Sequence, residues 1–285
     1  MSAPSPAPRV HLLPDGLINK IAAGEVVERP ASVVKELVEN AVDAGATRIE
    51  VDVEGGGRGL IRVRDDGCGM GRQDSLSCLQ RHATSKIRCD DDLFRIGSFG
   101  FRGEAIPSIA EISRFELRSG EQGAEVGTRV VVDAGAIEAI EDAANPGGTE
   151  ISVRRLFVNT PARLKFLKSD RTELGHIVEW MTRVALAQPG IAIRLTADGR
   201  AVLDLPAAGT LRERAEALLG AAVAEGLRDV NEREGDLAIE GLVSTPSMNR
   251  TSAAGLHLFV NGRFVRDRAV TGAVLAAYRD LLPRG

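Results

Sequence analysis

The sequence predicts an α+β fold in which helices cover one face of a mixed β-sheet. Apolar residues recur at three- and four-residue spacing between Pro30 and Gly45 and again over 172–187, which is typical of amphipathic helices. Apolar and polar residues alternate over 47–53 and 60–65, which is typical of half-buried strands. We expect further strands at 129–132, 150–156, 191–195 and 201–205.

A second, smaller domain is expected after 206–209, where Pro, Ala and Gly interrupt the periodic segments. The chain has 285 residues, which is long enough for one sizeable core and a smaller one. On this basis it divides into a disordered tail (1–10), a first domain (11–208) and a second domain (209–285). Elements expected in the second domain are helices at 211–219 and 268–282 and strands at 237–243 and 256–260.

Composition excludes several classes of protein. The N-terminal tail is rich in Pro, Ser and Ala and has no apolar run like a secretory signal, and no segment is long enough to span a membrane. Cys68, Cys78 and Cys89 lack paired spacing, so neither a zinc site nor a disulfide framework is indicated. We therefore expect a cytoplasmic protein. The formal net charge of −4 argues against a strongly nucleic-acid-binding surface.

The first candidate site lies on the helix that follows Pro30. Glu36, Asn40 and Asp43 recur at the spacing of one helical face, and residues four apart point about 40° from each other. A carboxylate and an amide therefore lie one turn apart. The alternative is an ordinary solvated face, which is the commoner outcome for such a face taken alone.

The second candidate is the segment that follows the strand at 60–65. By the period of two, Asp65 lies on the same face as Ile61 and Val63, so its carboxylate points inward. A buried carboxylate requires hydrogen-bond donors, and the amino group of a ligand would supply one. Gly67 and Gly69 allow the backbone to turn tightly and approach a flat ligand. The alternative is an ordinary Asp-Gly turn.

The third candidate is the glycine-rich stretch at 97–105, which leads into an apolar, helix-like segment. Backbone N–H groups at such a loop can hold phosphates, and Arg102 adds a positive charge. Just upstream, Thr84, Ser85 and Lys86 supply two hydroxyls and an ammonium on a segment that could close as a lid. The alternative is an ordinary loop. The sequence supports neither a Walker-type loop nor a Rossmann fingerprint.

Several motifs occur together: Ile-Ala-Ala-Gly-Glu-Val-Val-Glu-Arg-Pro (21–30), Asp-Asp-Gly-Cys-Gly-Met (65–70), His-Ala-Thr-Ser-Lys (82–86), Gly-Phe-Arg-Gly-Glu-Ala (100–105), Asn-Thr-Pro-Ala-Arg (159–163) and Val-Asn-Gly-Arg (260–263). In these the chain resembles the MutL family of DNA mismatch repair proteins, from about His11 to Asp267. MutL belongs to the GHKL ATPase superfamily, together with the gyrase B subunit, the ninety-kilodalton heat-shock chaperone and sensor histidine kinases. The resemblance implies a Bergerat-type ATP-binding sheet followed by part of a domain similar to ribosomal protein S5 domain 2.

The resemblance also implies roles for individual residues, with ATP and Mg²⁺ as the cofactors. Glu36 would be the general base that activates the attacking water, and Asn40 would be the magnesium ligand. Asp65 would accept a hydrogen bond from the adenine amino group. The other implied nucleotide-binding residues are Asp43, Gly69, Met70, Thr84, Ser85, Lys86, Gly100, Phe101, Arg102, Gly103, Glu104 and Thr149.

The implied function is an ATP-driven switch in mismatch repair. An ATP-dependent homodimer would close as a clamp on DNA. The clamp would couple a MutS-type mismatch-recognition protein to a downstream nuclease and helicase. The protein would be cytoplasmic and, in a bacterium, associated with the nucleoid. Arg263, Arg266 and Arg268 are candidates for weak DNA contact that does not depend on base sequence.

The chain departs from the family pattern at its end. Relatives continue to a His-Pro-x-Lys motif whose lysine reaches the γ-phosphate, whereas this sequence ends at Gly285. We therefore expect an incomplete second domain and slow hydrolysis. The main alternative function is a nucleotide-gated scaffold that binds repair partners without hydrolysis. A sensor kinase or a topoisomerase is disfavoured, because neither a phosphoacceptor helix nor a long second half with a cleavage tyrosine is present.

Overall fold

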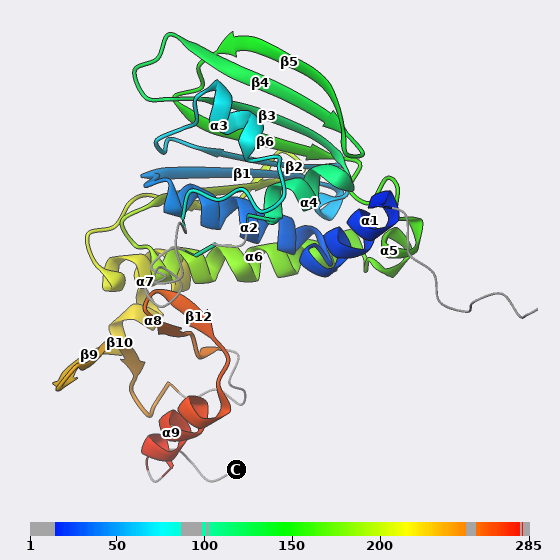
Figure 1. Ribbon diagram of the computed structural model, residues 1–285. Helices are drawn as coiled ribbons and strands as arrows, with labels where there is room; N and C mark the ends of the chain where they lie inside the picture. The colour runs from blue at the N-terminus through cyan, green and yellow to red at the C-terminus, as the bar shows by residue number, and fades with distance from the viewer. Residues whose placement is uncertain (1–14, 87–98, 101–102, 249–254, 280, 282–285) are drawn as a thin grey trace, which may run out of the picture.

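The computed structural model describes residues 15–86, 99–100, 103–248, 255–279 and 281. Its first part is an eight-stranded sheet in the order β5-β4-β3-β6-β2-β1-β7-β8 (Figure 1). Strands β1 and β7 are parallel and the other neighbours are antiparallel, so the sheet is mixed. The strands are β1 (Arg48–Glu54), β2 (Leu60–Asp65), β3 (Arg114–Gly120), β4 (Val126–Asp133), β5 (Ala136–Ala144), β6 (Gly148–Arg154), β7 (Ala192–Ala197) and β8 (Arg200–Leu205).

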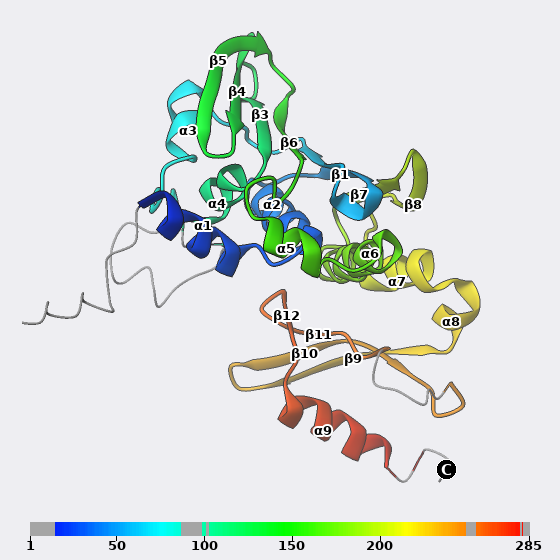
Figure 2. The same ribbon diagram turned by 90° about the vertical axis from the view of Figure 1, so that its right-hand side faces the viewer.

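A layer of helices packs against one face of this sheet. Figures 1 and 2 show α1, α2, α4 and α6 together on that side. The helices of this part are α1 (Asp15–Val26), α2 (Pro30–Asp43), α3 (Arg72–Ser77), α4 (Ala105–Glu111), α5 (Pro161–Phe166) and α6 (Asp170–Ala187). The predicted arrangement, a mixed sheet with helices on one face, is confirmed.

Helix α2 follows from its sequence. Pro30 occupies the first helical position, where its missing N–H has no intrahelical partner to lose, and Gly45 adopts a φ of 73° just after the last turn. The apolar stripe is buried at Val34, Leu37, Val38 and Ala41. This burial fixes the rotation of the helix, and with it the direction in which each polar side chain points.

Strands β1 and β2 form the predicted antiparallel pair, joined by a glycine turn at 55–59. Ile49 lies opposite Asp65, and Val51 lies opposite Val63. Several elements were not predicted, among them α1, β3 and β5. Strand β5 is an edge strand that is exposed along most of its length, so it carries little alternation of apolar and polar residues to detect.

The C-terminal part begins after β8 and lies on the side of the helical layer that faces away from the sheet (Figure 2). It contains α7 (Leu211–Leu219), α8 (Ala221–Glu225), the hairpin of β9 (Leu227–Glu234) and β10 (Leu237–Ser244), the hairpin of β11 (Leu258–Val260) and β12 (Arg263–Val265), and α9 (Arg268–Tyr278). Helix α7 matches its predicted range, and α9 ends earlier than predicted. The division into domains stays a prediction.

The C-terminal part contacts the first through α7 and through the hairpin of β11 and β12. Arg214 of α7 is fully buried, and its Nη2 donates to the carbonyl oxygens of Pro189 and Ile191, both at 2.6 Å. On the hairpin of β11 and β12, the ring of Phe264 lies 4.0 Å from the guanidinium carbon of Arg183 on α6. The hairpin is therefore packed directly on α6.

One acidic residue of α2 is buried with the apolar stripe. Glu39 is only 8% exposed, and burial raises its pKa to about 7 from the usual 4.5. The ammonium of Lys35 opposes this rise, and the carboxylates of Glu36 and Asp43 add to it. Between pH 4.5 and about pH 7, Glu39 is protonated in the folded chain and ionised in the unfolded chain.

This difference predicts a pH-dependent stability. Because the pKa of Glu39 is raised in the folded chain, its contribution to the unfolding free energy is complete below pH 4.5. That contribution is lost as the pH rises through about 7. Relative to Glu39→Gln, the wild type should lose about 3 kcal/mol of unfolding free energy across this window. Urea unfolding of both proteins at pH 5 and pH 8 measures the change.

The exposed Glu54→Gln is the matched control, because it makes the same substitution outside the core. The prediction would be contradicted if wild type and Glu39→Gln differed in unfolding free energy by the same amount at both pH values.

Candidate functional site

The structure brings three separate segments together at the C-terminal half of α2. Lys86 Nζ lies 3.0 Å from Asn40 Oδ1 and 2.5 Å from Asp43 Oδ2. Asp43 also accepts hydrogen bonds from the backbone N–H of Phe99 at 2.9 Å and of Gly100 at 3.3 Å. The predicted lid segment and the glycine-rich loop therefore both meet the polar face of α2.

Glu36 lies one turn before Asn40 on this face of α2. Its side chain is 23% exposed, and its Oε1 accepts a hydrogen bond from Lys35 Nζ at 3.0 Å. The pair is made by adjacent residues of the helix. Glu36 is therefore accessible to solvent and already held by a cation.

Asp65 ends β2 with its side chain buried, as the strand period predicted. Its Oδ1 accepts a hydrogen bond from the backbone N–H of Gly67 at 2.9 Å, and in the sheet it lies opposite Thr149 of β6. Burial raises the pKa of Asp65, while hydrogen bonds from the backbone of Gly67 and Thr149 oppose the rise. The carboxylate is thus an acceptor in a largely enclosed place.

Ser119 of β3 connects the residues around Asp65, and the sequence analysis missed it. Its hydroxyl lies 2.8 Å from that of Thr149 and accepts from the backbone N–H of Met70 at 2.9 Å. Phe115 and Leu117 alternate with polar residues just before it and could have indicated this strand. Ser119 is fully buried, so these hydrogen bonds fix the loop after β2 against the sheet.

The loop at 67–69 closely approaches its surroundings and requires glycine. At Gly69, φ is 67° and an added Cβ would lie 2.0 Å from the carbonyl oxygen of Gly120. The N–H of Cys68 donates to the carbonyl oxygen of Ala44 at 3.0 Å, which ties this loop to the end of α2. The two candidate motifs are therefore neighbours in space.

The glycine-rich loop and the lid segment also contact each other. The N–H of His82 donates to the carbonyl oxygen of Gly103 at 3.2 Å, and Glu104 Oε1 lies 3.0 Å from His82 Nδ1. Thr84 Oγ1 accepts from the N–H of Lys86 at 3.2 Å, and Ser85 between them is exposed. The predicted phosphate contacts of Phe101 and Arg102 lie outside the described residues.

The donor set at Asn40 fits a divalent cation. A carboxamide oxygen and a carboxylate oxygen face the same point, and the ammonium of Lys86 lies between them. Oxygen donors of this kind are the ligands that Mg²⁺ takes in proteins, usually together with waters and substrate phosphates. The position already attracts a positive charge.

The three arginines proposed for DNA contact have different surroundings. Arg263 is partly buried and lines a cavity between the hairpin and α2. Arg266 is exposed and its Nη2 lies 3.1 Å from Glu179 Oε1 on α6. Arg268 is exposed in the first turn of α9.

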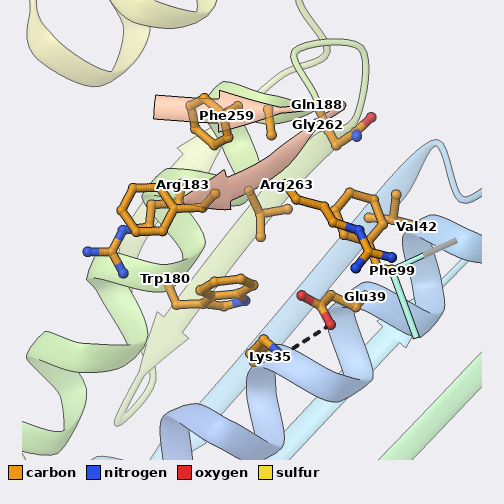
Figure 3. A pocket seen from close by; sticks show the side chains of 13 residues that line it. Lys35, Glu39, Val42, Phe99, Trp180, Arg183, Gln188, Phe259, Gly262 and Arg263 are labelled. Carbon is orange, nitrogen blue, oxygen red and sulfur yellow. Dashed lines mark ion pairs between the residues drawn. The ribbon is translucent and has the colours of Figure 1, made fainter. Parts of the chain in front are cut away.

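That cavity is a feature the sequence analysis did not predict. It has a volume of about 230 Å³ and lies between α2, α6 and the hairpin of β11 and β12. Figure 3 shows Lys35 and Glu39 of α2 facing Trp180 and Arg183 of α6 across it. The i,i+4 spacing of Lys35 and Glu39 was the sequence signal for this pair.

Comparison with known proteins agrees with this architecture. Residues 28–150 match the family of histidine kinase-, DNA gyrase B- and HSP90-like ATPases, and residues 215–285 match the C-terminal domain family of DNA mismatch repair proteins. The DNA mismatch repair protein MutL of Geobacter sulfurreducens is 52% identical over 97% of this chain and 46% of its own length. That of Anaeromyxobacter sp. strain K is 52% identical over 98% of this chain and 46% of its own. The chain thus spans about half the length of the curated relatives it matches.

Solved structures show the same relationship. The Aquifex aeolicus MutL ATPase domain complexed with ADP is 30% identical and superposes with a TM-score of 0.68 over 88% of each chain. Another structure of the Aquifex aeolicus MutL ATPase domain is 27% identical, with a TM-score of 0.65 over 90% of this chain and 87% of that one. The eight-stranded sheet with its helices is therefore the GHKL ATPase fold, and an S5-like second domain fits the C-terminal part. Because the likeness to the ADP-bound domain extends over most of both chains, this chain belongs to the MutL family of DNA mismatch repair proteins.

Proposed function

We propose that this chain binds ATP with Mg²⁺ and hydrolyses it as the nucleotide-dependent switch of DNA mismatch repair. The observation that carries the proposal is the convergence of α2, the lid segment and the glycine-rich loop on Asp43. It gathers a carboxylate, a carboxamide, an ammonium and backbone N–H groups at one place. Phosphoryl transfer depends mostly on positioning and on neutralising charge, and these groups can do both.

The adenine would bind at the loop after β2. Asp65 would accept from the amino group of the base, with Thr149 beside it, and Gly69 and Met70 would border the ring. The support is the enclosed Asp65 carboxylate and the close backbone approach at Gly69. A buried acceptor discriminates strongly between ligands that can and cannot donate to it.

The phosphates would bind between α2 and the loops. Asn40 would hold Mg²⁺, which supplies charge neutralisation at the phosphates. Lys86 would contact the phosphates with Thr84 and Ser85, while the backbone from Gly100 to Glu104, with Arg102, would surround them. Glu36 would accept a proton from the attacking water as general base.

Assembly and partners extend the proposal. ATP would order the lid, two copies would close as a clamp on DNA, and the clamp would couple a MutS-type protein to a nuclease and a helicase in the bacterial cytoplasm. The names of the bacterial relatives support the repair role. Among the described residues, no helix is both long and apolar enough to cross a bilayer.

Glu36→Ala tests the catalytic assignment. Without the general base, ATP hydrolysis should fall by about a hundredfold or more, while the dissociation constant for ATP stays unchanged. Phosphate release and equilibrium nucleotide binding measure the two quantities. Size-exclusion chromatography should show a dimer that forms with ATP and persists in this variant.

Wild-type hydrolysis by Glu36→Ala would contradict the role of Glu36. If Glu36→Ala loses hydrolysis but keeps every partner interaction and mismatch-repair activity, the nucleotide-gated scaffold is the better description.

Asp65→Asn tests the recognition of adenine. The amide keeps one acceptor oxygen and places an NH2 donor where the second oxygen was, so the N–H of Gly67 and the amino group of the base can no longer each face an oxygen. The dissociation constant for ATP should therefore rise about ten- to hundredfold. Inosine triphosphate lacks that amino group and is the matched control ligand. The variant should bind it with nearly wild-type affinity, and equal weakening for both nucleotides would contradict the assignment.

Arg268→Ala tests the DNA contact. Removing an exposed phosphate-binding charge should weaken binding to duplexes of any sequence, and should lower the slope of log affinity against log salt by about one. Fluorescence anisotropy at several salt concentrations measures both quantities. Arg200→Ala, which removes another exposed arginine on β8, is the control, and equal effects of the two substitutions would argue against a specific DNA contact at Arg268.

A further inference from the structure

Helix α2 presents two neighbouring polar faces with different surroundings. Glu36, Asn40 and Asp43 share the face that meets the lid and the glycine-rich loop. Lys35 and Glu39 share the adjacent face, which lines the cavity toward α6 (Figure 3). The first face belongs to the proposed catalytic site, and the second borders it.

Lys35 connects the two faces. Its Nζ lies 3.4 Å from Glu39 Oε2 on its own face and 3.0 Å from Glu36 Oε1 on the other. Adjacent residues of a helix point about 100° apart, so the ammonium reaches around the helix to contact Glu36. The ammonium of Lys35 therefore forms ion pairs with two carboxylates, those of Glu36 and Glu39.

The cavity wall determines where this cation lies. The side chain of Glu39 is 10% exposed and has little freedom to move, and the ring centroid of Trp180 lies 5.7 Å from Lys35 Nζ. An ammonium at that distance from an indole ring is attracted by the negative charge of the ring face. Lys35 Nζ therefore has two further partners, Glu39 and Trp180, besides Glu36.

We propose that Lys35 is a positioning residue for Glu36. The ammonium binds one carboxylate oxygen, which fixes the side chain and leaves the other oxygen for the attacking water. Glu39 and Trp180 set the position of the ammonium. This inference rests on the proposed role of Glu36 as the general base.

The test compares single-turnover ATP hydrolysis and ATP affinity across a set of variants. Lys35→Met should lower the rate about tenfold or more, because misplacement of a catalytic group by about 1 Å is that damaging, with ATP affinity within about twofold of wild type. Lys35→Arg keeps the donor and should restore most of the rate. Lys165→Met removes an exposed lysine of α5 as the matched control and should change neither quantity.

A spectroscopic measurement supplements the kinetics. Trp180 is the only tryptophan of the chain, so its fluorescence reports on the ammonium beside it. Lys35→Met should shift the emission, whereas Lys35→Arg and Lys165→Met should leave it near that of wild type. Should Lys35→Met fail to fold, Trp180→Leu replaces it, and the rate should then fall severalfold with unchanged ATP affinity.

The outcomes separate this inference from the proposed function. A wild-type rate no higher than that of Glu36→Ala overturns the assignment of Glu36 and the inference with it. If Glu36→Ala is inactive but Lys35→Met hydrolyses ATP like wild type, only the role of Lys35 is overturned. Equal loss in Lys35→Met and Lys35→Arg, or loss of ATP affinity in proportion to the rate, also overturns it.

Discussion

The packing of α2 against the sheet is the interaction on which the rest of the structure depends. Val34, Leu37, Val38 and Ala41 are buried in the core, and their burial leaves the helix only one rotation. Every polar side chain of α2 then has a fixed direction. Asn40 and Asp43 point to the lid and the glycine-rich loop, while Lys35 and Glu39 point to α6.

Charge balance on α2 follows from this geometry. Three carboxylates of α2 have a cation beside them: Lys86 binds Asp43, and Lys35 contacts both Glu36 and Glu39. Both cations are lysines, whose flexible stems can reach partners on a neighbouring face. The lysine beside Asp43 comes from the lid and the other from α2 itself. Two different segments of the chain thus neutralise adjacent carboxylates on one helix.

Sequence reasoning predicted the elements whose periodicity is strong. The bounds of α2, the pairing of β1 with β2, the range of α7 and the inward direction of Asp65 all follow from local pattern. It missed β5, because an exposed edge strand needs no apolar alternation. It also missed Ser119, since a buried serine is recognised only when its partners are known. Periodicity alone predicted a mixed sheet with helices on one face. The motifs shared with the MutL family added that this sheet belongs to the GHKL ATPase fold.

By itself, the sequence determined the direction of side chains within single elements, because helix and strand periods are fixed by backbone geometry. It therefore placed Glu36, Asn40 and Asp43 on one face and turned Asp65 inward. Only the tertiary structure decided which distant groups meet those side chains. The contact of Lys86 with Asn40 spans 46 positions, and the cavity between Lys35 and Trp180 requires α6 to pack beside α2. Contacts of this kind depend on how whole elements pack, and no local pattern specifies that packing.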